Sequence, residues 1–228
     1  MRAATPKSPT DPDFANVSLL LHGDGANGST TIIDSSPTPK TVTAVGNAQV
    51  NTAVTDPFGR TGVGILAFDG SDDGLTIPSS SDLSFTGDFT FEFWMRFVSI
   101  PGDYICIVTG LTGSTQMFIT TLFGGTGLRW GLTGVAEYST AAYTWATGTW
   151  FHIALVRNSS NVKFYVNGIN ISGAGKTNSN SFSGDLNIAN SVPGASAFNG
   201  YIDDLRITKG VARYTANFTP PTAPFPDS

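Results

Sequence analysis

The stretch FTFEFWMRF, residues 89–97, decides the fold class. Apolar residues alternate through it with a second, more polar set. One face would carry Phe89, Phe91, Phe93, Met95 and Phe97, and the other Thr90, Glu92, Trp94 and Arg96. Successive strand residues point to opposite faces of a sheet, so period two over the whole stretch predicts a β-strand between a packed core and a partly solvent-exposed face.

Similar segments lie on both sides of this strand. VSLLLHGDG (17–25), TIIDSS (31–36) and KTVTAVGNAQV (40–50) precede it, and WFHIALVR (150–157), GDLNIAN (184–190) and FNGYIDDLRIT (198–208) follow. VKFYVNGINIS (162–172) predicts a hairpin with Asn167-Gly168 at its turn, where positive φ costs little. No segment of useful length has a 3.6-residue period, although KGVARYT (209–215) could form one helical turn. We therefore predict an all-β fold, an antiparallel two-sheet β-sandwich.

Composition supports that class and excludes several partners. The 228 residues include 26 glycines and only 13% charged residues, as in short strands joined by tight turns. The net charge is -5, with no cluster of Lys or Arg, so we expect no nucleic-acid partner. No apolar run is long enough for a membrane span or a signal-peptide core, so neither membrane binding nor standard secretion is expected. The lone Cys106 is interpreted as a buried structural thiol.

Three regions are expected along the chain. Residues 1–16 are proline-rich and predict an extended N-terminal arm that docks on a partner. Residues 17–219 form the sandwich, and residues 220–228 are a proline-rich C-terminal tail.

Several phrases in order resemble a known family. They are LAFDGSDDGLTIPSSSDLSFTGDFTFEFWMRF, WFHIALVR, VKFYVNG, LNIAN and FNGYIDDLRITKGVARYTANFTPPTAPFP. The ordered series resembles the laminin G-like branch of the concanavalin A-like lectin/glucanase superfamily, and the resemblance covers roughly residues 17–226. The opening LLLHGDG and the closing RYTANFTPPTAPFP are similar to the version found in bacteriophage virion proteins, which has Phe where Gly23 stands here. The resemblance implies a jelly roll with adjacent chain ends, in a superfamily whose members bind glycans, cleave them or mediate adhesion and assembly.

Two groups of residues are glycan-binding candidates. Glu92, Trp94 and Arg96 would share one strand face, where an indole stacks on sugar C–H groups while charged groups fix hydroxyls. The favoured alternative is a same-face charge pair beside a packed Trp. Trp130, Tyr138 and Trp145 lie in a loop-rich segment with Tyr143 and Trp150, and either line a recognition surface or seal loops over the core.

No catalytic residue is predicted. Glycoside hydrolysis needs two carboxyl groups facing each other across the scissile bond. Glu92 has no acidic same-face neighbour, Glu137 lies in a separate segment, and adjacent Asp203 and Asp204 would point to opposite strand faces. A glycan hydrolase or lyase is therefore the least favoured function.

Calcium is the cofactor to consider. DGSDDG (69–74) has the first spacings of a calcium loop, but its twelfth position is Ser80, which favours a hairpin turn. If the first and last strands are neighbours, Asp24 could meet Asp203 or Asp204, as calcium ligands do in some relatives of the family. For the adjacent pair Asp203 and Asp204, we expect one aspartate to be structural or metal-linked and the other to be solvated. His22 and His152 have no second ligand at metal spacing and are interpreted as structural.

The functional expectation is a non-enzymatic bacteriophage virion protein, on capsid or tail. It would be made in the host cytoplasm without a signal peptide, displayed on the virion surface, and would contact other virion proteins through its arm and host-surface polysaccharide through the sandwich. A homotrimer is compatible with this role. The alternative is a purely structural decoration protein without a ligand.

Overall fold

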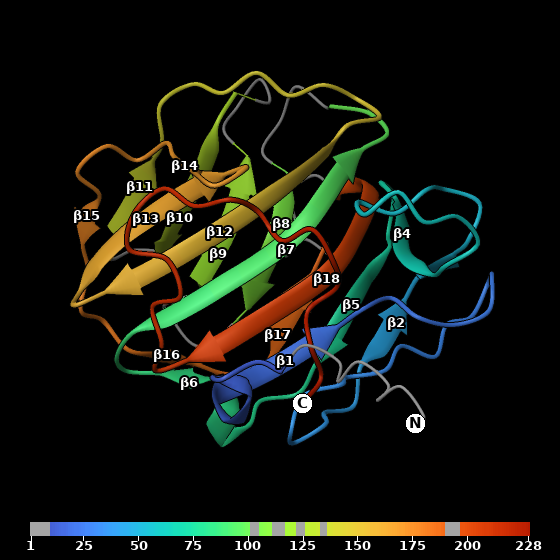
Figure 1. The fold of residues 1–228 in the computed structure, drawn as a ribbon, viewed down its shortest axis with the longest axis horizontal. Helices are drawn as coiled ribbons and strands as arrows, with labels where there is room; N and C mark the ends of the chain where they lie inside the picture. The colour runs from blue at the N-terminus through green and yellow to red at the C-terminus, as the bar shows by residue number, and fades with distance from the viewer. Residues whose placement is uncertain (1–9, 101–104, 111–116, 122–125, 133–135, 190–196) are drawn as a thin grey trace, which may run out of the picture.

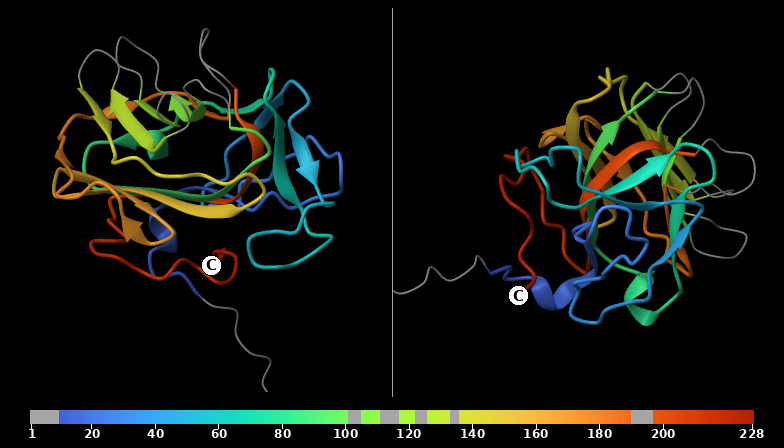
Figure 2. Two further views of the ribbon diagram at one scale, coloured as in Figure 1. Left: turned by 90° about the horizontal axis from the view of Figure 1, so that it is seen from above. Right: turned by 90° about the vertical axis from the view of Figure 1, so that its right-hand side faces the viewer.

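The computed structural model describes residues 10–100, 105–110, 117–121, 126–132, 136–189 and 197–228. Within these residues the chain forms two large antiparallel sheets packed face to face, as Figure 1 and the edge-on view in Figure 2 show. The predicted all-β sandwich is confirmed. No helix of the described part is long and apolar enough to cross a membrane.

Sheet A lies in front in Figure 1 and is built around β7. Its main path is β14 (Ile169–Asn170), β13 (Asn161–Val166), β12 (Trp150–Asn158), β7 (Phe89–Phe97), β18 (Asn199–Lys209), β4 (Ile65–Asp69) and β3 (Gln49–Asn51). In addition, β1 (Val17–Leu21) pairs with β18 and β15 (Lys176–Thr177) pairs with β13. The first and last strands are thus neighbours, which is the condition under which Asp24 was expected to meet Asp203 or Asp204.

Sheet B covers the inner face of sheet A. Its order is β11 (Ala136–Ser139), β10 (Leu128–Leu132), β9 (Met117–Thr121), β8 (Cys106–Gly110), β17 (Leu186–Ile188), β5 (Gly74–Ile77) and β2 (Thr43–Val45). A small two-stranded sheet joins β6 (Ser84–Phe85) and β16 (Phe182–Ser183). The side chain of Cys106 lies outside the described residues.

The core between the sheets contains the predicted phenylalanine row. Phe91, Phe93 and Phe97 are at most 1% exposed and join apolar residues of sheet B such as Ile119 and Trp130. Burying aromatic rings of this size is the dominant favourable contribution to folding. The period-two pattern of β7 therefore identified the inner face correctly.

Local predictions were confirmed at one turn and wrong at two segments. Asn167 (φ 48°) and Gly168 (φ 77°) form the turn between the antiparallel β13 and β14. Residues 31–36 are not a strand, since only Thr31 forms a bridge, to Thr43. Residues 209–215 contain no helical turn: β18 continues to Lys209 and an irregular segment follows.

Both ends of the described chain pack on the outer face of sheet A, the face turned away from sheet B. The C-terminal segment, red in Figure 1, crosses β12, β7 and β18, and Figure 2 shows it outside the sheet. The Asp11 N–H donates to the Ser228 carbonyl over 2.9 Å, so the two ends lie side by side. Phe225 is buried against Val17 and Leu20.

The predicted arm and tail therefore differ from the structure. Residues 1–9 lie outside the described residues, but residues 10–16 are docked on the chain's own sandwich and include a 3₁₀ turn at Phe14–Asn16. Residues 220–228 are docked as well, through Phe225. Together the two ends form part of the fold from residue 10 to residue 228.

Candidate functional site

The outer face of sheet A gathers most of the polar side chains singled out from the sequence. Thr90, Glu92 and Trp94 of β7 point to it, as predicted, yet all three are buried. The terminal segments and the loop between β3 and β4 cover this face. Phe58 of the loop, for example, packs edge-to-face on Trp94 with ring centroids 5.9 Å apart. The expectation of a partly solvent-exposed face was wrong for these three residues.

A buried charge network occupies the half of this face beneath the chain ends. It is defined by Asp11, Glu92, Arg206, Arg213 and Tyr214. Glu92 Oε1 accepts from Arg206 Nη2 at 2.8 Å, and its Oε2 accepts from the Tyr214 hydroxyl at 2.7 Å. Asp11 accepts from both Arg206 and Arg213, so one carboxylate ties the N-terminal segment to β18 and to the C-terminal segment.

The network keeps Glu92 ionised despite complete burial. Burial alone would raise the pKa of Glu92, but Arg206, His152 and Tyr214 together lower it to about 2. Both oxygens are engaged and no part of the residue reaches solvent. Glu92 is therefore a structural charge, and the interpretation favoured from sequence, a paired charge beside a packed Trp, describes its surroundings better than a glycan platform does.

A surface pocket of about 280 Å³ opens beside this network. We call it the Asp203 pocket, and it is lined by His22, Asp24, Phe58, Arg60, Asp203, Asp204, Pro224, Phe225, Pro226 and Asp227. The segment that follows β1, the β3–β4 loop, β18 and the C-terminal segment all contribute residues. The pairing of β1 with β18 and the docking of the C-terminal segment create it.

An irregularity in β18 shapes this pocket. The register of β18 against β7 shifts between Asp203 and Arg206, and Asp204 has φ 48°, a left-handed conformation unusual for a residue other than glycine. Asp204 Oδ1 lies 2.6 Å from His22 Nδ1, and its Oδ2 accepts from the Phe225 N–H at 2.8 Å. Burial opposes a charged imidazole, but the bond to Asp204 raises the pKa of His22. His22 is thus structurally paired, as predicted.

Asp203 is the unusual residue of the pocket. It is 1% exposed, its Oδ1 accepts from the Asp204 N–H, and its Oδ2 has no hydrogen-bond partner among the described residues. Burial, followed by the charge of Asp204, raises the pKa of Asp203 to about 8. The expectation that one aspartate of this pair is solvated was wrong, since both are buried.

The predicted calcium ligands share the Asp203 pocket but do not form a compact ligand group. Asp24, Asp203 and Asp204 all line it, and both oxygens of Asp204 are already engaged. Within the described part of the chain, the three acidic residues whose ligand atoms lie within 4.8 Å of one another are Asp69, Asp72 and Asp73. Calcium binding stays a prediction.

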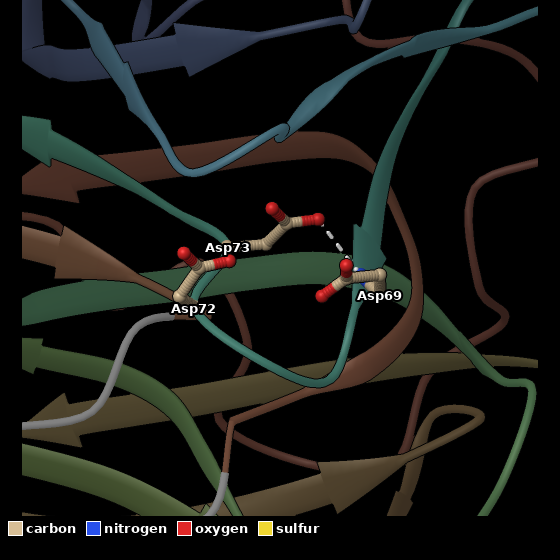
Figure 3. Close-up of side chains that lie close together, drawn as sticks. All are labelled: Asp69, Asp72 and Asp73. Carbon is tan, nitrogen blue, oxygen red and sulfur yellow. Dashed lines mark hydrogen bonds between the residues drawn. The ribbon is translucent and has the colours of Figure 1, made fainter.

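Those three aspartates belong to the turn that follows β4, drawn in Figure 3. Asp73 Oδ2 accepts from the Asp69 N–H at 2.8 Å, and Asp73 Oδ1 accepts from the Asn47 N–H at 2.7 Å. The turn is not a hairpin as predicted, because β4 belongs to sheet A and β5 to sheet B. Its carboxylates stabilise a crossing from one sheet to the other by accepting backbone N–H groups.

A half-exposed row crosses the far end of the outer face. Trp150 of β12 lies opposite Arg96 of β7, and Arg96 lies opposite Tyr201 of β18. The Arg96 guanidinium lies over the Tyr201 ring, 5.9 Å from its centroid, and the Trp150 indole N–H donates to the Thr55 carbonyl at 2.9 Å. We call this set the Trp150 row. Unlike Glu92 and Trp94, its three side chains all reach solvent.

The loop-rich aromatic candidates are divided by the structure. Trp130 is fully buried and stacks on Tyr138 with centroids 5.4 Å apart, while Trp145 packs on Phe97 and Phe151 in the core. Tyr138 is half-buried, and its hydroxyl donates to the Thr177 carbonyl. The two tryptophans therefore complete the core, so that Arg96 and Tyr138 are the glycan candidates that reach solvent.

Several residues of the pocket and the row were not selected from sequence. Phe58, Arg60, Tyr201 and Asp227 carried no signal, because the β3–β4 loop, strand β18 and the C-terminal segment bring them to one face. The residue with a usable signal was Trp150, since it is the first residue of a strand with clear alternation and lies two residues after Gly148, in a turn.

The fold is a jelly roll whose outer face carries the charge network, the Asp203 pocket and the Trp150 row. Residues 69–213 match the family described as the concanavalin A-like lectin/glucanases superfamily. The chain therefore belongs to this superfamily, in its laminin G-like branch. No curated protein sequence matches it.

Solved structures share the fold at low sequence identity. Domain 4 of AbnA, a GH43 extracellular arabinanase from Geobacillus stearothermophilus in complex with arabinotriose, has 20% identity and a TM-score of 0.63, with 86% of this chain and 95% of that chain covered. Botulinum neurotoxin type C, whose cell entry depends on interaction with two ganglioside molecules, has 18% identity and a TM-score of 0.60, with 86% and 48% covered. Trypanosoma rangeli sialidase in complex with sialic acid has 16% identity and a TM-score of 0.63, with 88% and 31% covered. This chain thus spans less than half the length of the last two proteins.

Proposed function

We propose that this protein is a non-enzymatic glycan-binding module displayed on the surface of a bacteriophage particle. The observation that carries the binding half is the Trp150 row, an arginine between two aromatic side chains that all reach solvent. An aromatic face stacks on sugar C–H groups, and a guanidinium donates several hydrogen bonds to hydroxyl or carboxylate oxygens. The arabinotriose complex of a domain with this fold supports sugars as the ligand class.

A binding role without catalysis is supported by the chemistry of the acidic residues. Glu92 is enclosed by Arg206 and Tyr214 and has no route to an external sugar. Asp203 and Asp204 are consecutive on one strand, rather than facing each other across a space for a glycosidic bond. Release of reducing ends from a host polysaccharide would overturn this half of the proposal.

The particle role is supported by the opening LLLHGDG and the closing RYTANFTPPTAPFP, which resemble bacteriophage virion modules. Such a module would be made in the host cytoplasm, and many copies on one particle would strengthen weak sugar binding through avidity. Cryo-EM of the assembled particle tests this directly. Absence of the chain from purified particles would refute it.

A glycan array of host-surface polysaccharides tests the binding half. Trp150→Ala and Arg96→Ala should each lower binding at least about tenfold, because each removes a stacking or charged contact. Lys176→Ala on the exposed strand β15 is the control, since it removes one positive charge from a distant edge of the same sheet. Equal binding by all variants would place the sugar elsewhere.

A structural decoration protein without a ligand is the second candidate. It is favoured by the burial of Glu92, Trp94, Trp130 and Trp145, which removes four of the glycan candidates from the surface. Silence across the array, together with particles that lose stability without this chain, would establish it in place of the binding function.

A further inference from the structure

We propose that the Asp203 pocket binds the primary ammonium group of an amino sugar. This inference rests on the proposed glycan binding and names the chemical class of the sugar. It starts from Asp203, a pocket-lining aspartate that is 1% exposed and whose Oδ2 has no partner among the described residues. A buried oxygen without a hydrogen bond is costly, and a donor supplied by a ligand would satisfy it.

The charges around Asp203 favour a cationic donor. Asp24, Asp203, Asp204 and Asp227 line the pocket, whereas its basic residues are His22 and Arg60. Both basic residues are already engaged: His22 lies against Asp204 at 2.6 Å, and Arg60 Nε donates to the buried Asp56 at 2.6 Å. The pocket thus has an excess of carboxylates that its own cations do not balance.

The walls of the pocket suit an organic cation better than a bare metal ion. Phe58, Pro224, Phe225 and Pro226 supply apolar surface for the carbon skeleton of a ligand. The described carboxylates that converge closely enough for a metal lie in the turn at Asp69, Asp72 and Asp73 instead. A sugar ring with one ammonium group matches both the acidic residues and the apolar residues that line the pocket.

The pocket is also placed to continue a glycan site. Asp203 lies opposite Trp94 on the outer face, and Tyr201, two residues earlier on β18, belongs to the Trp150 row. One oligosaccharide can therefore place an ammonium group at Asp203 while a neighbouring sugar lies on Tyr201 and Arg96. This contiguity is the reason for choosing an amino sugar rather than an isolated amine.

Binding should release a proton from Asp203. Besides burial, the charges of Asp204 and Asp56 favour the neutral acid, whereas the hydrogen bond from the Asp204 backbone N–H and the charge of Arg60 favour the carboxylate. His22, Asp24 and Asp227 face the same pocket. Because burial and the charge of Asp204 raise the pKa of Asp203 to about 8, the Asp203 side chain is uncharged in mildly acidic solution, and an ammonium ligand should ionise it.

Titration calorimetry of the full chain tests the proposal with two probes, a glucosamine trisaccharide and its fully N-acetylated counterpart. At a pH of about 6, in two buffers of different ionisation enthalpy, only the glucosamine probe should bind, with release of about one proton. Asp203→Asn should weaken binding about tenfold or more. Glu137→Gln is the control, because it removes one negative charge from the exposed edge of sheet B.

A second variant guards against loss of structure. Asp24 is exposed, so the Asp24→Asn variant should fold normally. Its affinity for the glucosamine probe should fall about two- to threefold, because one negative charge is lost. Equal binding of both probes, unaffected by Asp203→Asn, would overturn the ammonium site while leaving glycan binding intact. Binding of neither probe would also overturn it, and the array on the Trp150 row would then decide the proposed function separately. Stoichiometric calcium binding abolished by Asp203→Asn would overturn it in favour of a metal site.

Discussion

Glu92 and Asp203 are two buried carboxyl groups on the outer face of one sheet, and they have opposite electrostatic properties. Glu92 has a pKa of about 2, and Asp203 has a pKa of about 8. Both are at most 1% exposed, so burial does not explain the difference. Glu92 has Arg206 and Tyr214 as hydrogen-bond donors, whereas Asp203 has one backbone N–H and an adjacent aspartate.

The difference separates a structural half of this face from a half suited to a ligand. Around Glu92, the charge network connects the N-terminal segment, β7, β18 and the C-terminal segment. Asp203 lines a pocket, and one of its buried carboxyl oxygens has no hydrogen-bond partner in the part of the chain that the structure describes. Buried polar groups are normally satisfied within the protein, and an exception is where function is expected.

The largest expected effect is the loss of Glu92 from the network. Glu92→Gln removes the negative charge that balances Arg206 within a buried, hydrogen-bonded cluster. Breaking a buried ion pair by removing one partner typically costs about 3–5 kcal/mol. Urea unfolding followed by circular dichroism should show a loss of this size in the free energy of unfolding.

Glu137→Gln provides the matched control for that measurement. Glu137 pairs with Arg129 at 3.2 Å on the surface of sheet B, where an exposed pair contributes at most about 1 kcal/mol. If Glu92→Gln and Glu137→Gln lower the free energy of unfolding by the same amount, the network around Glu92 does not hold the outer face together.

The second effect is a pH dependence with opposite signs at the two carboxyls. The pKa of Glu92 falls from 4.5 to about 2 on folding, so its contribution to stability is present above pH 4.5 and is lost as the pH falls toward 2. The pKa of Asp203 rises from 3.8 to about 8, so the folded state keeps a proton that the unfolded chain releases. Asp203 therefore lowers stability progressively as the pH rises from 3.8 to about 8.

Asp203→Asn isolates that second contribution. The substitution preserves shape and cannot ionise, so the variant should match the wild type near pH 4 and exceed its unfolding free energy by on the order of a few kcal/mol near pH 8. Thermal and urea unfolding across this range give the difference directly. A constant difference at every pH would mean that Asp203 is ionised throughout, contrary to its surroundings.

Strand residues were predictable from sequence wherever one face is purely apolar. The alternation in FTFEFWMRF identified the core-facing row of β7, and Asn167-Gly168 identified a hairpin turn. TIIDSS failed because its apolar pair is not continued: Ile32 enters the core while Ile33 is 60% exposed. The local sequence pattern predicted strands correctly where burial alternates along the chain. It failed where a single buried side chain fixes an irregular loop.

The outer face could not be predicted in the same way. Alternation showed that Glu92 and Trp94 point away from the core, but it did not reveal that the chain ends and the β3–β4 loop would bury them. The Asp203 pocket depends on contacts far apart in sequence, such as His22 with Asp204. From sequence, adjacent acidic residues in a strand are expected to point to opposite faces. The register shift between Asp203 and Arg206 breaks this alternation, and no sequence signal marked it.

The smallest effect concerns how the N-terminal segment is held, and it compares two aspartates two residues apart. Asp11 is buried and accepts from Arg206 and Arg213, while Asp13 lies 3.9 Å from Arg213 with 39% of its side chain exposed. Asp11→Asn should lower the free energy of unfolding by about 1–3 kcal/mol, because a buried charged donor loses its acceptor. It should also increase hydrogen exchange in residues 11–18 and 225–228. Asp13→Asn should change stability by less than about 0.5 kcal/mol. Because Asp11 also meets the last residue through its backbone, equal exchange in both variants would mean that apolar contacts such as Phe225 with Leu20 hold the ends, and that the charge network serves only to neutralise Glu92.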